Sequence, residues 1–250
     1  MGMSYNDLEH MQKAFNEIGT SVKCLFEEKD CKNNAISDEI IKKFYEINKP
    51  LNINYMELGN AWLKEKDEKC DSSLFEKGKN YRALPFKRFP AKKYFKSIGF
   101  SHVSIDLNGN DGALKYDLGR LDQGLDQFNS FDVVANFGTS EHVKNHYECF
   151  VNIHNFCKKG GIFIHAVPQT GFWYRHGACY RWYTPEFFEN LCKLCNYNMI
   201  EAGVYGSPKF DYVKTYCIAQ KPILTNNCDG RSNFISKDEF KALEKFVFLN

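Results

Sequence analysis

Short apolar segments alternate with amphipathic helical segments after residue 53, and this alternation constrains the fold more than any other feature of the chain. Each apolar segment has the length of one strand, and the segments between them repeat apolar residues at helical spacing. Strand–helix–strand repetition predicts an α/β fold with a mainly parallel sheet and helices on both faces. The predicted strands are residues 54–58, 102–107, 113–116, 131–136, 161–167, 199–204 and 214–219. The clearest predicted helices are residues 90–98, 146–157 and 185–195.

Two flanking regions differ from this alternation. Residues 1–50 predict an N-terminal helical extension, because apolar side chains recur there at helical spacing and Pro50 ends the second helix. Residues 51–224 form the predicted α/β domain, which carries a basic insertion at about residues 64–98. Residues 225–250 predict a polar connector and a short terminal helix, and the sequence assigns this tail no role.

Charge and hydropathy limit the partners of the chain. The formal net charge is +2, so any attraction to polyanions has to be local. No segment has the roughly 18 consecutive apolar residues of a membrane-spanning helix, and the first residues lack the apolar core of a signal peptide. A cytoplasmic location with no membrane partner is therefore expected, with the cysteines reduced. Cys192 and Cys195 form a C-x-x-C pair without a second pair at matching spacing, so no metal site is predicted.

Glycine and acidic residues stand at the ends of four successive predicted strands. Glu57 and Gly59 end the first strand, Asp106 ends the second, Asp117 follows the third, and Gly138 follows the fourth. A glycine after a strand lets a ligand approach the backbone, and a carboxylate can accept hydrogen bonds from ribose hydroxyls or an amine. Each position alone is more typical of a turn or a helix cap. The ordered set nevertheless indicates a ligand site at the carboxyl edge of the sheet.

The order of these segments resembles the class I S-adenosylmethionine-dependent methyltransferases over about residues 53–222. Residues 131–143 contain F-D-V-V and E-H-V, residues 158–165 begin with K-K-G-G, and residues 183–188 are Y-T-P-E-F-F. The resemblance implies a Rossmann-like, seven-stranded sheet whose final strand, residues 214–219, is antiparallel. It also implies that the chain is an enzyme with S-adenosylmethionine as its cofactor.

The resemblance also implies roles for residues at the strand ends. The turn after the first strand would hold the methionine end of the cofactor, Asp106 its ribose, and Asp117 with Leu118 its adenine. The end of the fourth strand would line the methyl site. This chain departs from the family in having one glycine, Gly59, in the first turn where several are usual, so the backbone wraps the cofactor less closely. The implied cofactor-binding residues are Glu57, Gly59, Asn60, Asp106, Asp117, Leu118, Asn136, Phe137 and Gly138.

The basic insertion is a candidate acceptor surface. From Lys77 to Lys96 it contains eight Lys or Arg residues and no acid, with aromatic residues interleaved. The simpler interpretation is a solvated loop and helix whose aromatic rings pack on the sheet. The alternative is a landing surface for an anionic acceptor, such as a phosphate or a nucleic-acid backbone.

A second aromatic and basic segment follows the predicted fifth strand, whose carboxyl end borders the methyl site in the family. Its side chains could stack on a planar acceptor and pair with an anionic group, or they could cap the core. The candidate acceptor-binding residues are Trp173, Arg175, His176 and Arg181.

Glu141 and His142 are the candidate catalytic residues. A histidine titrates near neutral pH, which suits a general base beside the acceptor. Some methyltransferases of this class carry E-x-x-E-H and bind a divalent metal, but Gly138 stands at the position of their first glutamate. A metal is therefore not expected, and a purely structural His142 stays an alternative.

The sequence thus predicts S-adenosylmethionine-dependent methyl transfer to an unidentified anionic or planar acceptor, either a small molecule or nucleotide-like. A non-catalytic binding protein that keeps the methyltransferase fold is the first alternative, because the glycine turn is depleted. A nicotinamide-dependent oxidoreductase is a weaker alternative, since G-x-G-x-x-G does not follow the first strand. The sequence does not specify the oligomeric state.

Overall fold

The fold is seen in a computed structural model that describes residues 53–65, 87–97, 99–121, 123, 129–170, 179–207, 212–223 and 234–249. The predicted N-terminal helical extension and most of the basic insertion lie outside these residues. None of the helices within these ranges is long and apolar enough to cross a membrane.

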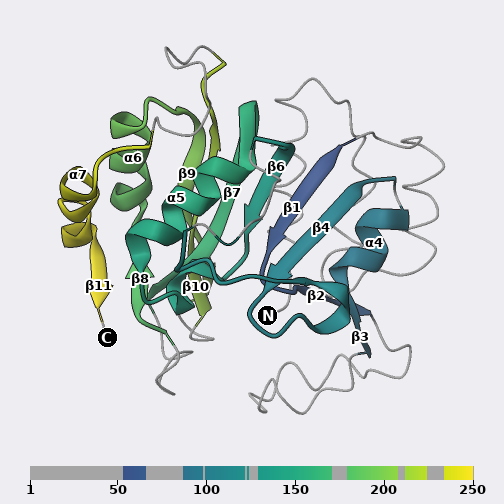
Figure 1. The fold of residues 1–250 in the computed structure, drawn as a ribbon. Coiled ribbons are helices and arrows are strands. Elements are labelled where there is room, and N and C mark those ends of the chain that lie inside the picture. Colours follow the sequence, from purple (N-terminus) through teal and green to yellow (C-terminus); the bar gives the residue numbers. More distant parts are fainter. Residues whose placement is uncertain are drawn as a thin grey trace.

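A seven-stranded sheet forms the centre of the molecule, with the strand order β5-β4-β1-β6-β7-β10-β9 (Figure 1). β1, β4, β5, β6 and β7 run parallel, whereas β10 is antiparallel to both of its neighbours. The expected mainly parallel sheet with an antiparallel final strand is therefore confirmed. The bounds are β1 (Asn54–Leu58), β4 (Ser101–Asp106), β5 (Leu114–Lys115), β6 (Phe131–Asn136), β7 (Cys157–Thr170), β9 (Asn198–Ser207) and β10 (Tyr212–Gln220).

The strand order reverses at β1, which lies between β4 and β6. Both neighbours are parallel to β1, and its last residue, Leu58, pairs with Ile105 on one side and Asn136 on the other. The loops that leave these three strands therefore emerge at one edge. Such a reversal is where ligands bind in open α/β sheets.

Helices cover both faces of the sheet. Alternate residues of a strand point to opposite faces. Tyr55 packs against Phe95 of α4, with ring centroids 4.6 Å apart, whereas Met56 belongs to the core that contains Phe150 of α5 and Phe187 of α6. The helices are α4 (Ala91–Ser97), α5 (His146–Phe156), α6 (Pro185–Leu194) and α7 (Lys237–Lys241), with 3-10 turns η3 (Asn110–Gly112), η4 (Ser140–His142) and η7 (Glu244–Phe246).

Two small antiparallel pairs, which the sequence analysis did not predict, flank the main sheet. β2 (Trp62–Glu65) pairs with β3 (Lys87–Pro90), so residues 62–65 and 87–90 lie side by side. β8 (Arg181–Tyr183) pairs with β11 (Val247–Leu249) near the C-terminus. The C-terminal strand β11 thus lies beside β8, the strand that follows β7 in the sequence.

Candidate functional site

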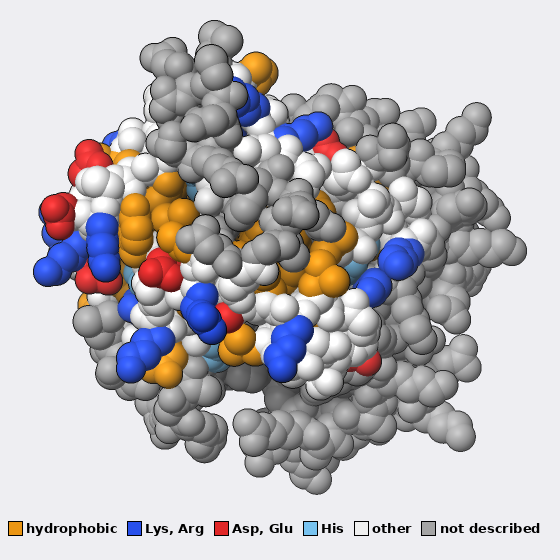
Figure 2. Space-filling view, in the orientation of Figure 1, with side chains coloured by type: hydrophobic (Ala, Val, Ile, Leu, Met, Phe, Trp, Pro, Cys, Tyr) orange, Lys and Arg blue, Asp and Glu red, His pale blue; other side chains and the backbone are white. Residues whose placement is uncertain are grey.

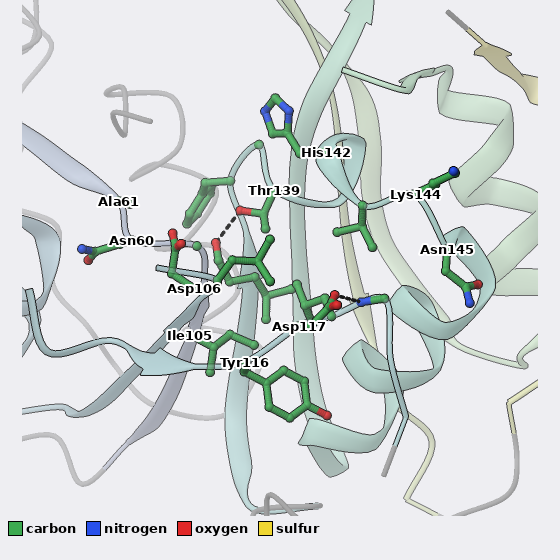
Figure 3. Close-up of a pocket in the computed structure, with 18 of the residues that line it drawn as sticks. Asn60, Ala61, Ile105, Asp106, Tyr116, Asp117, Thr139, His142, Lys144 and Asn145 are labelled. Carbon is green, nitrogen blue, oxygen red and sulfur yellow. Dashed lines mark hydrogen bonds between the residues drawn. The ribbon is translucent and has the colours of Figure 1, made fainter. Parts of the chain in front are cut away.

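A cavity of about 530 Å³ lies where the loops leave β1, β4, β5 and β6. Asp106, Asp117 and His142 come from three different strand ends around this one space (Figure 3). The volume lies in the range of small-molecule sites. The lining residues are Leu58, Gly59, Asn60, Ala61, Ile105, Asp106, Leu107, Tyr116, Asp117, Leu118, Gly119, Phe137, Gly138, Thr139, His142, Val143, Lys144, Asn145 and Tyr180.

The turn after β1 requires a glycine. Gly59 has a φ of 79°, and its amide donates to the carbonyl of Ile105 at 2.8 Å. A Cβ at this position would stand 2.5 Å from Oγ1 of Thr139, which itself donates to the carbonyl of Leu58 at 2.6 Å. The Gly59 amide therefore joins the end of β1 to β4, and Thr139 joins it to the loop after β6.

Glu57 lies beneath this turn and does not line the cavity. Its side chain is fully buried, and Oε1 accepts from the amide of Ala61 at 2.6 Å. Oε2 lies 3.1 Å from Nε2 of His102 on β4. The carboxylate therefore fixes the turn from inside the protein, whereas the sequence analysis expected it to accept from a ligand amine.

The loops after β4 and β5 present carboxylates on the cavity wall. Oδ1 of Asp106 accepts from the amide of Asn108 at 3.0 Å, and Oδ1 of Asp117 accepts from the amide of Gly119 at 2.8 Å. Each carboxylate thus stabilises its own turn through one oxygen. Asn60 links two loops, because its Nδ2 donates to the carbonyl of Asn110 at 3.1 Å.

The turn after β6 is organised by Asn136, which is fully buried and does not line the cavity. Its Oδ1 accepts from the amides of Thr139 and Ser140, at 3.2 and 3.1 Å. Phe137 and Gly138, which lie between the two ends of this loop, do line the cavity. Asn136 therefore shapes the wall that its neighbours form.

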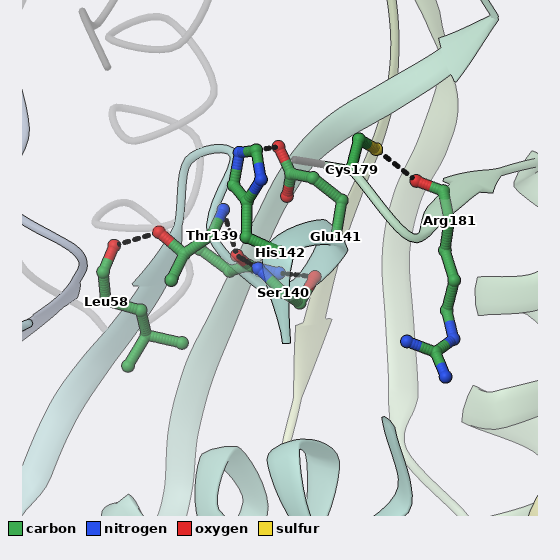
Figure 4. A network of polar contacts seen from close by, with 8 residues as sticks. Leu58, Thr139, Ser140, Glu141, His142, Cys179 and Arg181 are labelled. Atoms are coloured by element: carbon green, nitrogen blue, oxygen red, sulfur yellow. Dashed lines mark hydrogen bonds and ion pairs between the residues drawn. The ribbon is translucent and has the colours of Figure 1, made fainter. Parts of the chain in front are cut away.

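Glu141 and His142 stand together in η4 (Figure 4). His142 lines the cavity with its side chain 34% exposed, whereas the Glu141 side chain is fully buried. Nε2 of His142 lies 3.7 Å from Oε1 of Glu141, which is an ion-pair distance but longer than a hydrogen bond. The pair therefore combines an accessible imidazole with a carboxylate behind it.

Arg181 does not line the cavity, and its guanidinium points away from His142 (Figure 4). Nη1 donates to the carbonyl of Val143 at 2.7 Å, and Nη2 donates to that of Lys144 at 3.0 Å. This position differs from the acceptor contact that the sequence analysis expected. The other candidate acceptor residues, Trp173, Arg175 and His176, lie outside the described residues.

His146, four residues after His142, is buried in the aromatic core. Its Nε2 lies 3.0 Å from the hydroxyl of Tyr183, and burial lowers its pKa to about 4. Burial likewise lowers the pKa of His154 and of His165 to about 3. These three histidines are neutral at pH 7. Within the described parts of the chain, no group of three or more His, Cys, Asp or Glu residues is arranged to hold a metal ion.

Several wall residues were not anticipated from the sequence. Thr139 and Tyr116 stand next to predicted residues, and extending each strand-end motif by one position would have included them. Lys144 and Asn145 reach the cavity through a loop whose path depends on tertiary contacts, whereas Tyr180 belongs to the aromatic and basic segment that the sequence already indicated. Asn145 is the N-cap of α5, with Oδ1 accepting from the amide of Glu148.

Comparison with known proteins gives one family match. Residues 101–165 match the family model described as a methyltransferase domain. Among curated proteins, no relative matches the chain.

Solved structures with a similar arrangement share little sequence with the chain. A Burkholderia thailandensis 1,6-didemethyltoxoflavin-N1-methyltransferase is 12% identical, with a TM-score of 0.45 over 89% of this chain and 92% of its own. A methyltransferase from Archaeoglobus fulgidus is 11% identical, with a TM-score of 0.45 over 74% and 94%. A Haemonchus contortus phosphoethanolamine N-methyltransferase 2 is 14% identical, with a TM-score of 0.43 over 87% and 58%.

Proposed function

We propose that this chain is a class I S-adenosylmethionine-dependent methyltransferase, a proposal that the methyltransferase-domain match over residues 101–165 and the strand order support, and we propose an acceptor class and a proton route for it. The acceptor is an anionic or planar small molecule or a nucleotide-like molecule, and His142 removes its proton. The observation that carries this proposal is the position of His142 on the wall of the cavity, with the buried carboxylate of Glu141 behind it.

The residues of the cavity suit the cofactor. Two glycine turns with φ of 79° and 78°, at Gly59 and Gly138, bring backbone without side chains to the wall. Asp106 and Asp117 each have one oxygen hydrogen-bonded within its own turn, and the other can accept from a ligand hydroxyl or amine. We therefore propose that the cofactor is held by Gly59, Asn60, Asp106, Asp117, Leu118, Phe137 and Gly138, with Glu57 and Asn136 supporting the turns from beneath.

When bound, S-adenosylmethionine supplies a methyl group on a positively charged sulfur. The acceptor's lone pair forms the new bond to the methyl carbon while the carbon–sulfur bond breaks, and its electrons stay on sulfur. An acceptor that carries a dissociable proton passes it to His142. The carboxylate of Glu141, 3.7 Å from Nε2, would stabilise the positive charge that this proton places on the imidazole.

Two side chains on the cavity wall support the acceptor class. Tyr180 is 43% exposed and offers a ring on which a planar acceptor can stack. Lys144 is exposed on the same wall and offers a positive charge to an anionic group. On the face that Figure 2 draws, Lys and Arg side chains stand in separate groups, several of them beside Asp or Glu. We therefore propose that an anionic acceptor is bound by a local positive charge at Lys144, and not by a general attraction of the surface to polyanions.

Isothermal titration with S-adenosylmethionine, its demethylated product and NAD tests the cofactor assignment. The two sulfur compounds should bind and NAD should not. Gly59→Val should abolish their binding, because its Cβ would clash with Thr139. Gly160→Val is the matched control, since Gly160 also has a positive φ of 75° but stands outside the cavity.

A screen with radiolabelled cofactor then tests the acceptor class. Nucleotides, oligonucleotides, sugar phosphates and aromatic acids should include a methylated acceptor. Methylation of neutral aliphatic acceptors alone would reject the proposed class. Cofactor binding with no methylated acceptor would favour a non-catalytic binding protein.

A further inference from the structure

The C-terminal segment, residues 234–249, is joined to β8 by a ladder of backbone hydrogen bonds. β11 places Val247 opposite Tyr183 and Leu249 opposite Arg181. The hydroxyl of Thr184, the residue after β8, donates to the carbonyl of Phe246 at 3.1 Å. The position of Arg181 along its strand therefore depends on the C-terminal segment.

The same segment is fixed on the helical face of the sheet. Phe240 of α7 is 1% exposed, and its ring centroid lies 5.6 Å from that of Phe150 on α5 and 6.1 Å from that of Phe187 on α6. The hydroxyl of Tyr147 on α5 donates to the carbonyl of Ile235 at 3.2 Å. β11 is thus held by a buried anchor as well as by its ladder.

Arg181, in the strand that pairs with β11, also contacts the wall of the cavity. Its guanidinium donates to the carbonyls of Val143 and Lys144, two consecutive residues of the cavity wall, and the side chain is 9% exposed. A guanidinium is a rigid planar fork, so two simultaneous bonds fix the orientation of the peptide units that accept them. Asn145, the N-cap of α5, follows directly.

The Val143–Asn145 wall packs closely against the loop that holds Asp117. A Cβ at Gly119 would stand 3.1 Å from Cγ1 of Val143 and 3.2 Å from Oδ1 of Asp117. α5 holds the same loop, because Nδ2 of Asn152 donates to the carbonyl of Leu118 at 2.9 Å. A displacement of residues 143–145 would therefore also shift the loop that holds Asp117, and both segments line the cavity.

We propose that Arg181 is a positioning residue for cofactor binding, and that the C-terminal segment holds it in place. Arg181 acts through the wall at residues 143–145 and touches neither the cofactor nor the acceptor. This inference rests on the proposed function, since it concerns the cofactor site of that function.

Titration of the full chain with S-adenosylhomocysteine tests the role of Arg181. Arg181→Met removes both hydrogen bonds and should weaken binding about 10- to 100-fold, since hydrogen bonds to charged groups are among the stronger ones. Arg181→Lys keeps the charge and one donor, and it should restore part of the affinity. Lys237→Met, an exposed cation of the same C-terminal segment, is the control and should leave the affinity unchanged.

A second variant tests the ladder without touching Arg181. Phe248 is 57% exposed, so Phe248→Pro disturbs β11 with little loss of buried surface. It should also weaken binding, by about 3- to 10-fold, while the circular dichroism spectrum and cooperative melting show that the overall fold is kept. This variant tests the proposal even if Arg181→Met does not fold.

The outcomes separate the inference from the function on which it rests. If the parent chain binds S-adenosylhomocysteine and both folded variants bind it equally well, Arg181 is not a positioning residue. A change confined to the KM of the acceptor, with cofactor affinity unaltered, would make Arg181 an acceptor contact and overturn the inference. If the parent chain itself does not bind, the proposed function fails and this inference fails with it.

Discussion

The cavity wall and the aromatic core behind it use the same residue types in opposite ways. His142 lines the cavity with a third of its side chain exposed, whereas His146, four residues later at the start of α5, has its side chain 1% exposed. The His146 ring lies between Phe187 and Phe240, with centroids 5.4 and 4.9 Å away. The difference shows that burial, and not position in a motif, decides whether a histidine can exchange a proton with a ligand.

Polar groups are also stabilised differently in the two regions. Around the cavity, the carboxylates of Glu57, Asp106 and Asp117 accept hydrogen bonds from backbone amides of turns. In the core, His146 and His154 lie within hydrogen-bond distance of tyrosine hydroxyls and are kept neutral by burial. The turns around the cavity therefore hold carboxylates, whereas the aromatic core around His146 and His154 keeps its imidazoles neutral.

The largest expected effect is a loss of stability in mild acid. Burial lowers the pKa of His146 to about 4 and those of His154 and His165 to about 3, whereas an unfolded histidine titrates near 6.5. Between these values the unfolded chain binds protons that the folded chain does not, so the free energy of unfolding falls as pH falls. Each group should contribute ~2 kcal/mol between pH 7 and 5, or ~6 kcal/mol together. Urea unfolding at the two pH values measures this loss.

His146→Phe sharpens this test. It should reduce the pH-dependent loss by ~2 kcal/mol, because one of the three groups no longer titrates. Phe150→Leu in the same cluster should lower stability by the same amount at both pH values, because neither side chain titrates. An unchanged pH dependence in His146→Phe would show that the core does not exclude its charge.

The next effect concerns the exposed histidine. His142→Gln should lower kcat about 100- to 10 000-fold for an acceptor that loses a proton, the usual contribution of a general base. Affinity for S-adenosylhomocysteine should change little, and the rise of kcat with pH that reports the base should disappear. Lys193→Met on the exposed side of α6 is the control. Full turnover in the Gln variant would leave His142 a structural residue.

A third effect tests the carboxylate at the end of β4. Asp106→Ala should weaken binding of S-adenosylhomocysteine by about 2–4 kcal/mol, roughly 30- to 700-fold, if it accepts from two hydroxyls. Asp132→Ala is the matched control, because Asp132 stands near the start of β6 and pairs with Lys158 away from the cavity. Equal titration curves for the parent and Asp106→Ala would remove the carboxylate from the cofactor site.

The smallest effect tests the buried support under the first turn. His102→Phe keeps an aromatic ring beside Phe95 but removes the nitrogen that lies 3.1 Å from Glu57. Cofactor affinity should fall by about 1–2 kcal/mol, as for one hydrogen bond lost behind the binding surface. Phe95→Leu disturbs the same packing without touching Glu57 and should preserve affinity. Equal losses in both variants would mean that packing alone shapes the turn.

Much of the fold was predictable because its strands are buried and local in sequence. The bounds of β1 and β6 were predicted to the residue, since both strands are short and mostly buried and a glycine follows each within two residues. The β8–β11 pair was not predicted, because both strands are three residues long and no local pattern in either indicates that residues 181–183 and 247–249 pair. Sequence patterns report periodicity, and they do not report which distant segments meet.

The candidate site was predicted at the level of strand ends but not of side-chain direction. Gly59, Asp106, Asp117 and Gly138 line the cavity, whereas Glu57 and Asn136 point beneath it. The direction follows from the pleat of each strand and from partners such as His102, which the motif does not contain. Arg181 shows the same limit, because its position in the segment after the fifth strand suggested an acceptor contact, while its guanidinium donates to two carbonyls.

The order of strands in the sheet also has a consequence for synthesis of the chain. β1 leaves the ribosome before its two neighbours, yet it lies between them, so one of its edges stays open until β6 has been made. An open edge of an apolar strand is prone to pair with other chains. The hydrogen bond from Thr139 to Leu58 joins residues 81 positions apart in the sequence. It can form only after β6 and the loop that follows it have been made. A nascent chain halted before residue 131 would therefore leave one edge of β1 without a partner and would lack the cavity residues that follow β6.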